Sequence, residues 1–109
     1  MIELRESTYF ILAALLDGPR HGYAIVKAAE ELSGGTVRLS AGTLYGALTR
    51  LVDDGLVTVE REEVVGGRKR RYHALTSDGR AALAEEAARL HARAAVVQTR
   101  LAGATAATA

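Results

Sequence analysis

The sequence predicts an α+β fold that is mainly α-helical, with one small β-hairpin and a long C-terminal helix. Three observations lead to this prediction. Apolar residues recur at three- and four-residue spacing in three stretches before Gly55. A glycine pair, Gly66-Gly67, lies between two runs of alternating apolar and polar residues. A regular apolar repeat then runs from Leu83 to Leu101. The length of the chain, 109 residues, suffices for one domain with a modest core.

Composition excludes several classes of protein. Hydrophobic residues make up 49% of the chain, which is too many for an intrinsically disordered protein. The longest apolar run, residues 9–16, falls well short of the roughly 20 residues that span a bilayer. The sequence shows no secretory leader and no cysteine, so we expect a cytoplasmic chain without disulfides or thiolate metal sites.

Two amphipathic helices are predicted first. One extends from about Glu3 to Leu16 and ends at Asp17-Gly18-Pro19, because proline cannot continue the helical hydrogen bonds. The other extends from about Tyr23 to Leu32 and ends at Ser33-Gly34-Gly35. The residues expected to face the core are Leu4, Thr8, Ile11, Leu12, Leu15 and Leu16 in the first helix, and Ile25, Val26, Ala29 and Leu32 in the second.

A very short strand over residues 36–39 is predicted to lead into a third helix. Ser40 supplies the kind of side-chain oxygen that commonly caps a helix N-terminus. Gly55 is expected to end the helix in the left-handed conformation. The buried stripe of this helix is predicted to consist of Leu44, Ala47, Leu48, Leu51 and Val52.

The opposite face of the third helix predicts a recognition helix. It carries Gly42, Tyr45, Gly46, Thr49, Arg50 and Asp53. Small residues allow close approach to another surface, and threonine, tyrosine and arginine donate hydrogen bonds to phosphates and base edges. For two of these residues an alternative to a DNA contact stays open. Tyr45 could pack against the second helix, and Arg50 could simply be solvated.

A β-hairpin is predicted after this helix. Residues 56–61 and 69–75 form its strands, with Gly66-Gly67 as the turn. The order helix, helix, short strand, helix, hairpin is that of a winged helix-turn-helix. Although the net charge is only +1, four consecutive cations predict contacts with DNA phosphates; they are Arg68, Lys69, Arg70 and Arg71. The alternatives are a solvated turn, or a structural role for Arg71 or Tyr72.

The last helix predicts a dimer. Thr76 is its expected N-cap, and its apolar residues, spaced four and three apart, are Leu83, Ala87, Leu90, Ala94, Val97 and Leu101. A winged domain this small cannot bury so long a seam, so the same helix of a second chain is the simplest partner. The predicted organisation is a DNA-binding domain at residues 1–76, a dimerisation helix at 77–102 and a disordered tail at 103–109.

No enzyme chemistry is predicted. His21, His73 and His91 are far apart in the sequence and have no cysteine or paired carboxylates nearby, so we expect no metal site. The acid pairs 53–54 and 62–63 are adjacent rather than placed across a cleft, and no serine has the context of a nucleophile. The sequence also lacks a glycine-rich phosphate loop, so neither an enzyme activity nor a cofactor is expected.

Three stretches of the chain resemble the PadR family of bacterial transcriptional regulators. They are residues 8–15 continuing into 18–23, residues 39–48 with Leu51 and Gly55-Leu56, and residues 70–76 with Gly79-Arg80. All three occur in the order and spacing typical of the family. The wing has His73 and Ala74 where relatives commonly have a second tyrosine and a charged residue. The chain also has no tryptophan, which the drug-binding members use at their dimer interface.

The resemblance implies a homodimer that binds a pseudo-palindromic operator in double-stranded DNA and usually represses transcription. It assigns DNA contacts to Ser40, Gly42, Thr43, Tyr45, Gly46, Thr49 and Arg50, and to the cations at 68–71. It assigns the dimer interface to the last helix, often with the first, where Phe10 is the candidate. It also implies a small-molecule or stress signal, of unknown identity, that releases the DNA. The alternatives are a winged-helix protein-interaction module without DNA binding and a ligand-sequestering dimer.

Overall fold

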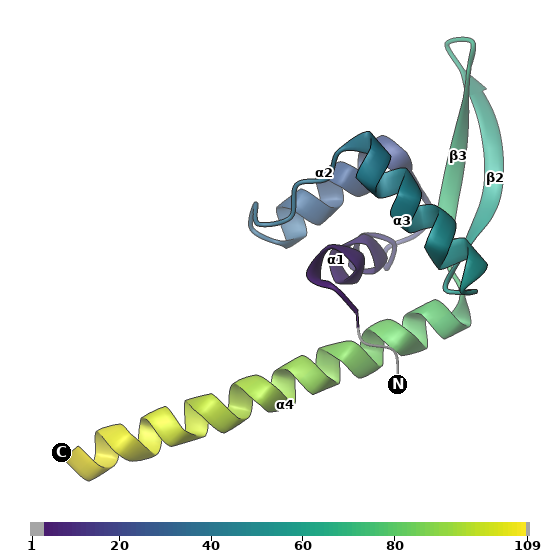
Figure 1. Cartoon of the computed structure of the whole chain (residues 1–109). Coiled ribbons are helices and arrows are strands. Elements are labelled where there is room, and N and C mark those ends of the chain that lie inside the picture. The colour runs from purple at the N-terminus through teal and green to yellow at the C-terminus, as the bar shows by residue number, and fades with distance from the viewer. Residues whose placement is uncertain (1–3, 109) are drawn as a thin grey trace.

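The computed structural model describes residues 4–108 and confirms the mainly helical α+β fold (Figure 1). In chain order the elements are α1 (Glu6–Ala14), β1 (Arg20–His21), α2 (Gly22–Leu32), α3 (Ala41–Asp53), β2 (Val57–Val65), β3 (Arg68–Leu75) and α4 (Ser77–Thr108). Helices α1, α2 and α3 pack together, the hairpin of β2 and β3 (the wing) stands beside α3, and α4 extends away as one long helix. Within the described residues, no helix is both long enough and apolar enough to cross a membrane.

The small sheet has the strand order β1-β3-β2, and neighbouring strands are antiparallel. Its short edge strand is Arg20–His21, which pairs with Tyr72 and His73 of β3. The prediction of a strand over residues 36–39 is therefore wrong, because these residues have no regular secondary structure. The physical reason is that β1 and β2 already occupy both edges of β3, so the loop before α3 has no free edge of β3 with which to pair.

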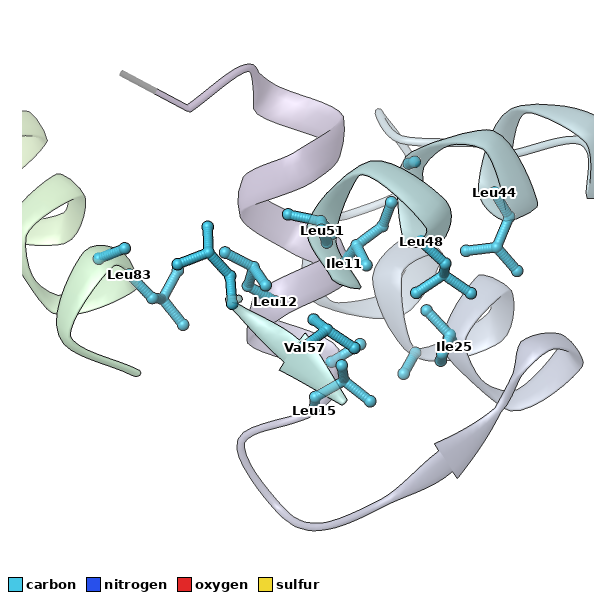
Figure 2. Packing of buried hydrophobic residues seen from close by; sticks show 14 residues of the cluster. Ile11, Leu12, Leu15, Ile25, Leu44, Leu48, Leu51, Val57 and Leu83 are labelled. Carbon is cyan, nitrogen blue, oxygen red and sulfur yellow. The ribbon is translucent and has the colours of Figure 1, made fainter. Parts of the chain in front are cut away.

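The core lies where α1, α2 and α3 meet the base of the wing (Figure 2). The largest fully buried side chains are Ile11, Leu12, Leu15, Ile25, Leu44, Leu48 and Val57. Leu83 of α4 packs against the same cluster. Burying one large aliphatic side chain stabilises a fold by about 1.5–3 kcal/mol, so this cluster holds α3 in place against α1 and α2.

Three residues predicted to face the core are instead substantially exposed. Leu16 follows the end of α1, where helical periodicity no longer applies, and Leu32 is the last residue of α2. Val52 lies on the flank of α3 that faces the wing, beside Val59 of β2. The other predicted stripe residues of α3 are buried as expected; they are Leu44, Ala47, Leu48 and Leu51.

The turn of the wing confirms the glycine signal in the sequence. Val65 pairs with Arg68, so Gly66 and Gly67 alone form the loop between the paired residues. Their φ angles are 58° and 78°, in the left-handed region. A two-residue turn with both φ values positive matches the right-handed twist of the strands, and it favours glycine at both positions.

Helix α4 is longer than predicted. Its first turns pack against the core through Ala82 and Leu83, the Glu86 carboxylate accepts a hydrogen bond from the Leu4 N–H at 3.1 Å, and the helix then extends away from the rest of the fold (Figure 1). The helix continues to Thr108, so the predicted helix end at residue 102 and the predicted disordered tail disagree with the structure over residues 103–108. Alanine has the highest helix propensity of all residues, and the alanines here outweigh the single Gly103. Ala109 lies outside the described residues.

The end of α3, the start of β2 and the start of α4 meet at the backbone of Leu56. Gly55, with a φ of 77°, turns the chain out of α3 as predicted. The Leu56 carbonyl oxygen accepts a hydrogen bond from the Thr76 N–H at 3.1 Å, and the Thr76 hydroxyl donates to the Gly55 carbonyl oxygen at 2.6 Å. The same hydroxyl accepts from the Gly79 N–H at 2.9 Å, which confirms Thr76 as the N-cap of α4. Gly79 packs so closely that a Cβ atom there would overlap the Leu56 carbonyl oxygen.

We expect Gly79→Ala to destabilise the protein by about 3 kcal/mol, because the new methyl group would displace backbone rather than a flexible side chain. Gly103→Ala is the matched control: nothing lies within 4 Å of a Cβ atom there, and alanine should stabilise α4 by up to about 1 kcal/mol. Urea unfolding followed by circular dichroism, at one protein concentration, measures both changes. A Gly79→Ala variant as stable as the unmodified protein would show that the junction relaxes without cost.

Candidate nucleic-acid interface

The exposed face of α3 begins at a defined N-terminus. The Ser40 hydroxyl oxygen accepts a hydrogen bond from the Thr43 N–H at 3.2 Å, so Ser40 is the N-cap of α3 as predicted. The Ser40 hydroxyl also donates to the Thr43 hydroxyl oxygen at 3.0 Å. Both residues are exposed at the positive end of the helix dipole. This end of α3 is therefore suited to contact phosphate oxygens or other acceptors.

The predicted recognition face of α3 is accessible to a partner. Its exposed residues are Gly42, Thr43, Tyr45, Thr49 and Arg50, and Gly46 is half-buried. The Thr49 hydroxyl donates to the Tyr45 carbonyl oxygen at 2.9 Å, one turn earlier in the helix. Gly42 and Gly46 carry no side chain, so a partner could approach the α3 backbone closely at these two positions.

The spacing of these residues in the sequence places them on one face of α3, but in the structure they border two different hollows. Tyr45 and Thr49 border a hollow of about 200 Å³ between α3 and the wing, which Arg71 and His73 also border. Arg50 borders a different hollow, of about 480 Å³, on the side of residues 4–8 at the start of α1. The structure therefore does not bring Arg50 together with the cations of the wing.

Tyr45 is both packed and exposed. Its side chain is 54% exposed, yet a Cβ atom on Gly22 would lie only 2.6 Å from the Tyr45 hydroxyl oxygen. Gly22 therefore leaves the space that lets Tyr45 lie across the start of α2. The alternative in which Tyr45 packs against the second helix is correct for the hydroxyl end of the ring, and much of the side chain faces solvent.

The start of α2 contributes surface residues that the sequence pattern did not indicate. Tyr23 is 70% exposed, and the Lys27 ammonium group lies 5.8 Å from its ring centroid. Tyr23 and Tyr45 border a cleft of about 320 Å³ together with the four wing cations, residues 68–71. The four-residue spacing of Tyr23 and Lys27 places them on one helix face, but only the packing of α2 beside β3 brings Tyr23 opposite the wing.

The four wing cations are not equivalent. Arg68, Lys69 and Arg71 are exposed, and Arg70 is partly buried. Arg71 Nε donates a hydrogen bond to Glu62 Oε1 at 2.9 Å across the two strands. The Arg61 guanidinium lies 4.0 Å from the ring centroid of Tyr72, and its Nε donates to Glu63 Oε1 at 2.9 Å. Tyr72 and Arg71 therefore have structural contacts within the wing, as one of the alternatives held.

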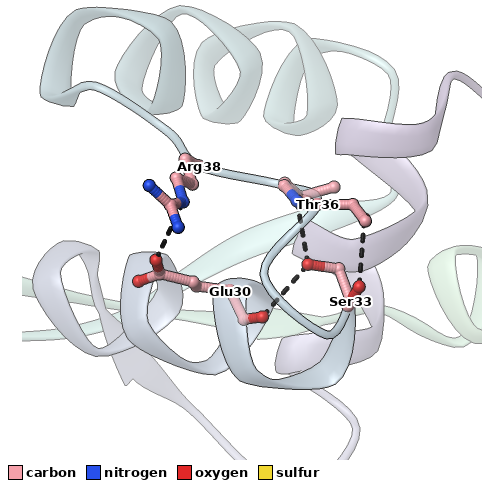
Figure 3. A network of polar contacts seen from close by, with 5 residues as sticks. Glu30, Ser33, Thr36 and Arg38 are labelled. Carbon is pink, nitrogen blue, oxygen red and sulfur yellow. Dashed lines mark hydrogen bonds and ion pairs between the residues drawn. The ribbon is translucent and has the colours of Figure 1, made fainter.

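A polar network fixes the loop that leads into α3 (Figure 3). The Ser33 hydroxyl oxygen accepts from the Val37 N–H at 2.9 Å, and the hydroxyl donates to the Glu30 carbonyl oxygen at 3.1 Å. The Thr36 hydroxyl donates to the Ser33 carbonyl oxygen at 3.0 Å, and Arg38 pairs with the Glu30 carboxylate at 3.4 Å. These contacts replace the pairing that a strand would have supplied, and they set where α3 begins.

Two histidines lie where β1 meets β3. His21 is the N-cap of α2, because its Nδ1 accepts from the Ala24 N–H at 3.5 Å. His73 is 5% exposed, and its Nδ1 has no hydrogen-bond partner in the described part of the chain. Burial lowers the pKa of both imidazoles, and a neighbouring cation lowers each further: Arg71 for His73 and Arg70 for His21. Both rings are therefore mainly neutral at pH 7.

The side chains of this surface are arranged for binding. Between residues 4 and 108, no group of three or more histidine, aspartate or glutamate side chains is placed to hold a metal ion. The hollows beside α3 are open and are bordered mostly by arginine, tyrosine, threonine and aliphatic side chains. Such a surface offers donors and positive charge to an extended polyanion.

Known proteins similar to this chain include transcriptional regulators. Residues 11–85 match the family described as transcriptional regulator PadR-like, a range that begins in α1, contains α3 and the wing, and ends within α4. Transcriptional regulator Rv3488 of Mycobacterium tuberculosis is 45% identical over 76 residues, which are 70% of this chain and 67% of that protein. A 37.1 kDa protein in transposon TN4556 of Streptomyces fradiae is 46% identical over 82 residues, which are 75% of this chain and 22% of that protein.

A solved structure with the same fold is that of Bacillus subtilis PadR in complex with operator DNA. Its TM-score against this chain is 0.66 with 28% sequence identity, and the match covers 74% of this chain and 47% of that one. This chain thus spans about two thirds of Rv3488, about half of Bacillus subtilis PadR and about a fifth of the transposon protein.

The two neutral histidines predict that the protein loses stability in mild acid. A histidine in the unfolded chain titrates near pH 6.5, and the fold lowers the pKa of His73 and His21 below that value. Below about pH 6.5 the unfolded state therefore binds more protons than the folded state, and the stability present above that pH is lost as pH falls toward the folded pKa. We expect the urea midpoint to fall between pH 7.5 and pH 5.5, and to fall less in His73→Leu. An equal fall in both proteins would assign the effect to groups other than His73.

Proposed function

The chain belongs to the transcriptional regulator PadR-like family, and we propose that it acts as a homodimer that binds a pseudo-palindromic operator in double-stranded DNA. The observation that carries this proposal is the exposed face of α3, with its hydroxyl groups and Arg50, beside a hairpin with four consecutive cations. The similar fold of Bacillus subtilis PadR, solved with operator DNA, supports the same use of this surface. The family consists of transcriptional regulators, so the chain is not an enzyme.

We assign α3 to the major groove and the wing to the flanking phosphates. The residues that would reach the groove are Ser40, Gly42, Thr43, Tyr45, Gly46, Thr49 and Arg50, which supply hydroxyl, backbone N–H and guanidinium donors. The residues that would contact phosphates are the wing cations Arg68, Lys69, Arg70 and Arg71. Tyr23 of α2 borders the same cleft as these cations, so it extends the phosphate surface.

We propose the exposed part of α4 as the dimer interface. Leu90, Val97 and Leu101 are 41%, 56% and 63% exposed, which is costly for apolar side chains in water. Ala87 and Ala94 lie on the same helix face and allow close approach of a second helix.

The packing of the single chain limits this interface at its N-terminal end. Leu83, the first residue of the predicted seam, is 5% exposed and belongs to the core of its own subunit, so a partner helix would meet the seam only beyond it. Phe10 of α1 is partly buried against Tyr9, with the ring centroids 5.2 Å apart, and its remaining surface would extend the interface onto α1.

Charge favours an antiparallel arrangement of the two α4 helices. Residues 87–109 contain no acidic residue but include Arg93 and Arg100. Glu85 lies before this segment, nearer the start of α4. Parallel helices would place each arginine beside its own copy, and antiparallel helices bring these arginines toward Glu85 of the partner subunit. Two α3 helices held at opposite ends of such a dimer would reach successive major grooves, roughly 34 Å apart.

The regulatory sense that we propose is repression. A dimer that occupies two successive grooves blocks other proteins from the same DNA, and this requires no further activity. A small-molecule or stress signal that changes the spacing of the two α3 helices would release the operator, because both helices must fit at once. An operator-binding protein works where the DNA is, so we place it in the cytoplasm.

A protein-interaction module without DNA binding is the less favoured alternative. A winged helix with that role is expected to carry acidic or apolar residues on the wing and on α3. Here β3 of the wing has the cations 68–71, although β2 also carries Glu60, Glu62 and Glu63, and the accessible face of α3 has hydroxyl groups and Arg50. This chemistry matches phosphates and base edges better than it matches an apolar protein surface.

The DNA-binding proposal is tested by selecting bound sequences from a random duplex pool and titrating the winner by fluorescence anisotropy. We expect Arg50→Ala to weaken binding to the selected duplex by about 1–3 kcal/mol and to change binding to random DNA much less. Arg80→Ala removes an exposed arginine from the start of α4 and serves as the control. Equal losses on both duplexes would make Arg50 a phosphate contact only, and failure of the unmodified protein to enrich any sequence would contradict the function.

The dimer is tested separately by Leu90→Asp, which places a charge in the proposed seam. We expect the dissociation constant of the dimer to rise by more than about 100-fold, because the carboxylate would be buried without a partner. Ala92→Asp carries the same charge on the opposite face of α4 and should leave the dimer intact. Sedimentation equilibrium measures both. Persistence of the full dimer in Leu90→Asp would place the interface elsewhere.

A further inference from the structure

We propose that Glu62 of β2 restrains Arg71 of β3 and thereby limits how tightly the wing binds DNA of any sequence. This inference rests on the proposed function, because it concerns the contact between the same wing and DNA phosphates. It assigns to Glu62 a role opposite to that of the wing cations. Glu62 therefore weakens DNA binding by the same hairpin whose cations favour it.

Glu62 and Arg71 face each other across the hairpin. They are partners in the register of β2 and β3, and Arg71 Nε donates to Glu62 Oε1 at 2.9 Å. Arg71 borders the hollow beside Tyr45 and Thr49 and also the cleft beside the start of α2. A DNA strand that passes from α3 to the wing would therefore meet this ion pair.

The other wing cations lack such an ion pair, although Arg70 lies opposite Glu63, whose carboxylate is bound by Arg61. Within residues 4–108, Arg68, Lys69 and Arg70 form no salt bridge, whereas Arg71 is bound by a carboxylate. The side chains of Arg71 and Glu62 are 64% and 44% exposed, so both are accessible to a phosphate and to counterions. The ion pair therefore lies at the surface, where the carboxylate of Glu62 reduces the positive electrostatic potential that DNA would meet.

Sequence-independent binding comes from cations that neutralise phosphates and release counterions from the DNA. An arginine already neutralised by a carboxylate releases few counterions, because its field in solution is largely cancelled. To contact a phosphate, Arg71 must leave Glu62 or bring the carboxylate near a second negative charge, and both are unfavourable. Glu62 therefore lowers the affinity of the wing for every duplex, random or selected.

Glu60 offers a matched control for the charge itself. It lies on the same strand, but it is the extra residue of a β-bulge between the pairs Val59–His73 and Arg61–Tyr72. Its carboxylate lies 3.9 Å from the Arg61 guanidinium on its own strand. Glu60→Gln therefore removes the same charge from β2 without releasing a wing cation.

The experiment measures binding of a random-sequence duplex and of the selected duplex at several salt concentrations. The proteins are the unmodified chain, Glu62→Gln, Glu60→Gln, Arg71→Ala and the double variant Glu62→Gln/Arg71→Ala. We expect Glu62→Gln to bind random DNA roughly fivefold more tightly at low salt, because the freed Arg71 guanidinium then neutralises one phosphate. The slope of log affinity against log salt should steepen by about 0.9, as for one additional phosphate contact.

The gain should disappear in the background of Arg71→Ala, because the freed arginine is its source. Glu60→Gln should give a much smaller change than Glu62→Gln. Weaker binding by Glu62→Gln would show that the carboxylate positions Arg71 for DNA, and an equal gain in Glu60→Gln would reduce the effect to net charge; either result overturns the proposal. Circular dichroism melting confirms that each variant is folded. Failure of the unmodified chain to bind any selected duplex would contradict the proposed function itself, which is a separate outcome.

Discussion

Three parts of this protein that must act together are joined at the backbone of Leu56. The carbonyl oxygen of Leu56 accepts the Thr76 N–H, and the absent side chain of Gly79 lets the first turn of α4 come against the same carbonyl group. Gly55 ends α3 immediately before this point, and β2 begins immediately after it. Helix α3, the wing and α4 are therefore connected through the backbone of Leu56 and its neighbours.

The candidate interface is organised by contacts that it makes in the absence of DNA. Ser40 caps α3, the Thr49 hydroxyl is bound to the helix backbone, and Arg71 is bound to Glu62. These contacts orient donors and reduce the side-chain freedom that binding would otherwise remove. Binding must break some of these contacts, such as the one between Arg71 and Glu62, and this lowers the net binding free energy. The proposed surface is therefore ordered before it binds, and several of its donors are already oriented.

Some expectations failed for reasons that lie in the tertiary structure. The loop at residues 36–39 has strand-forming residues, yet β1 and β2 occupy both edges of β3, and Ser33 supplies the hydrogen bonds instead. Leu83 fits the heptad pattern of α4, yet the core of the same chain buries it. Arg50 shares a helix face with Thr49, yet the two residues border different hollows. In each case a local pattern was compatible with several neighbours, and packing selected one.

The sequence by itself determined the helices, the wing and the caps, because these depend on local chemistry. Apolar spacing gave the buried stripe of α3, Ser40 and Thr76 gave two helix starts, and the Gly66-Gly67 pair gave the turn of the wing. The side chains of the third helix and the cations at 68–71, together with the family resemblance, placed the candidate DNA surface on α3 and the wing. Only the tertiary structure decided that Arg20–His21 forms the third strand, that Tyr23 lies opposite the wing, and that buried His73 finds no partner for Nδ1 among the described residues. These facts depend on which distant segments are in contact, and no spacing within a single helix or strand specifies that.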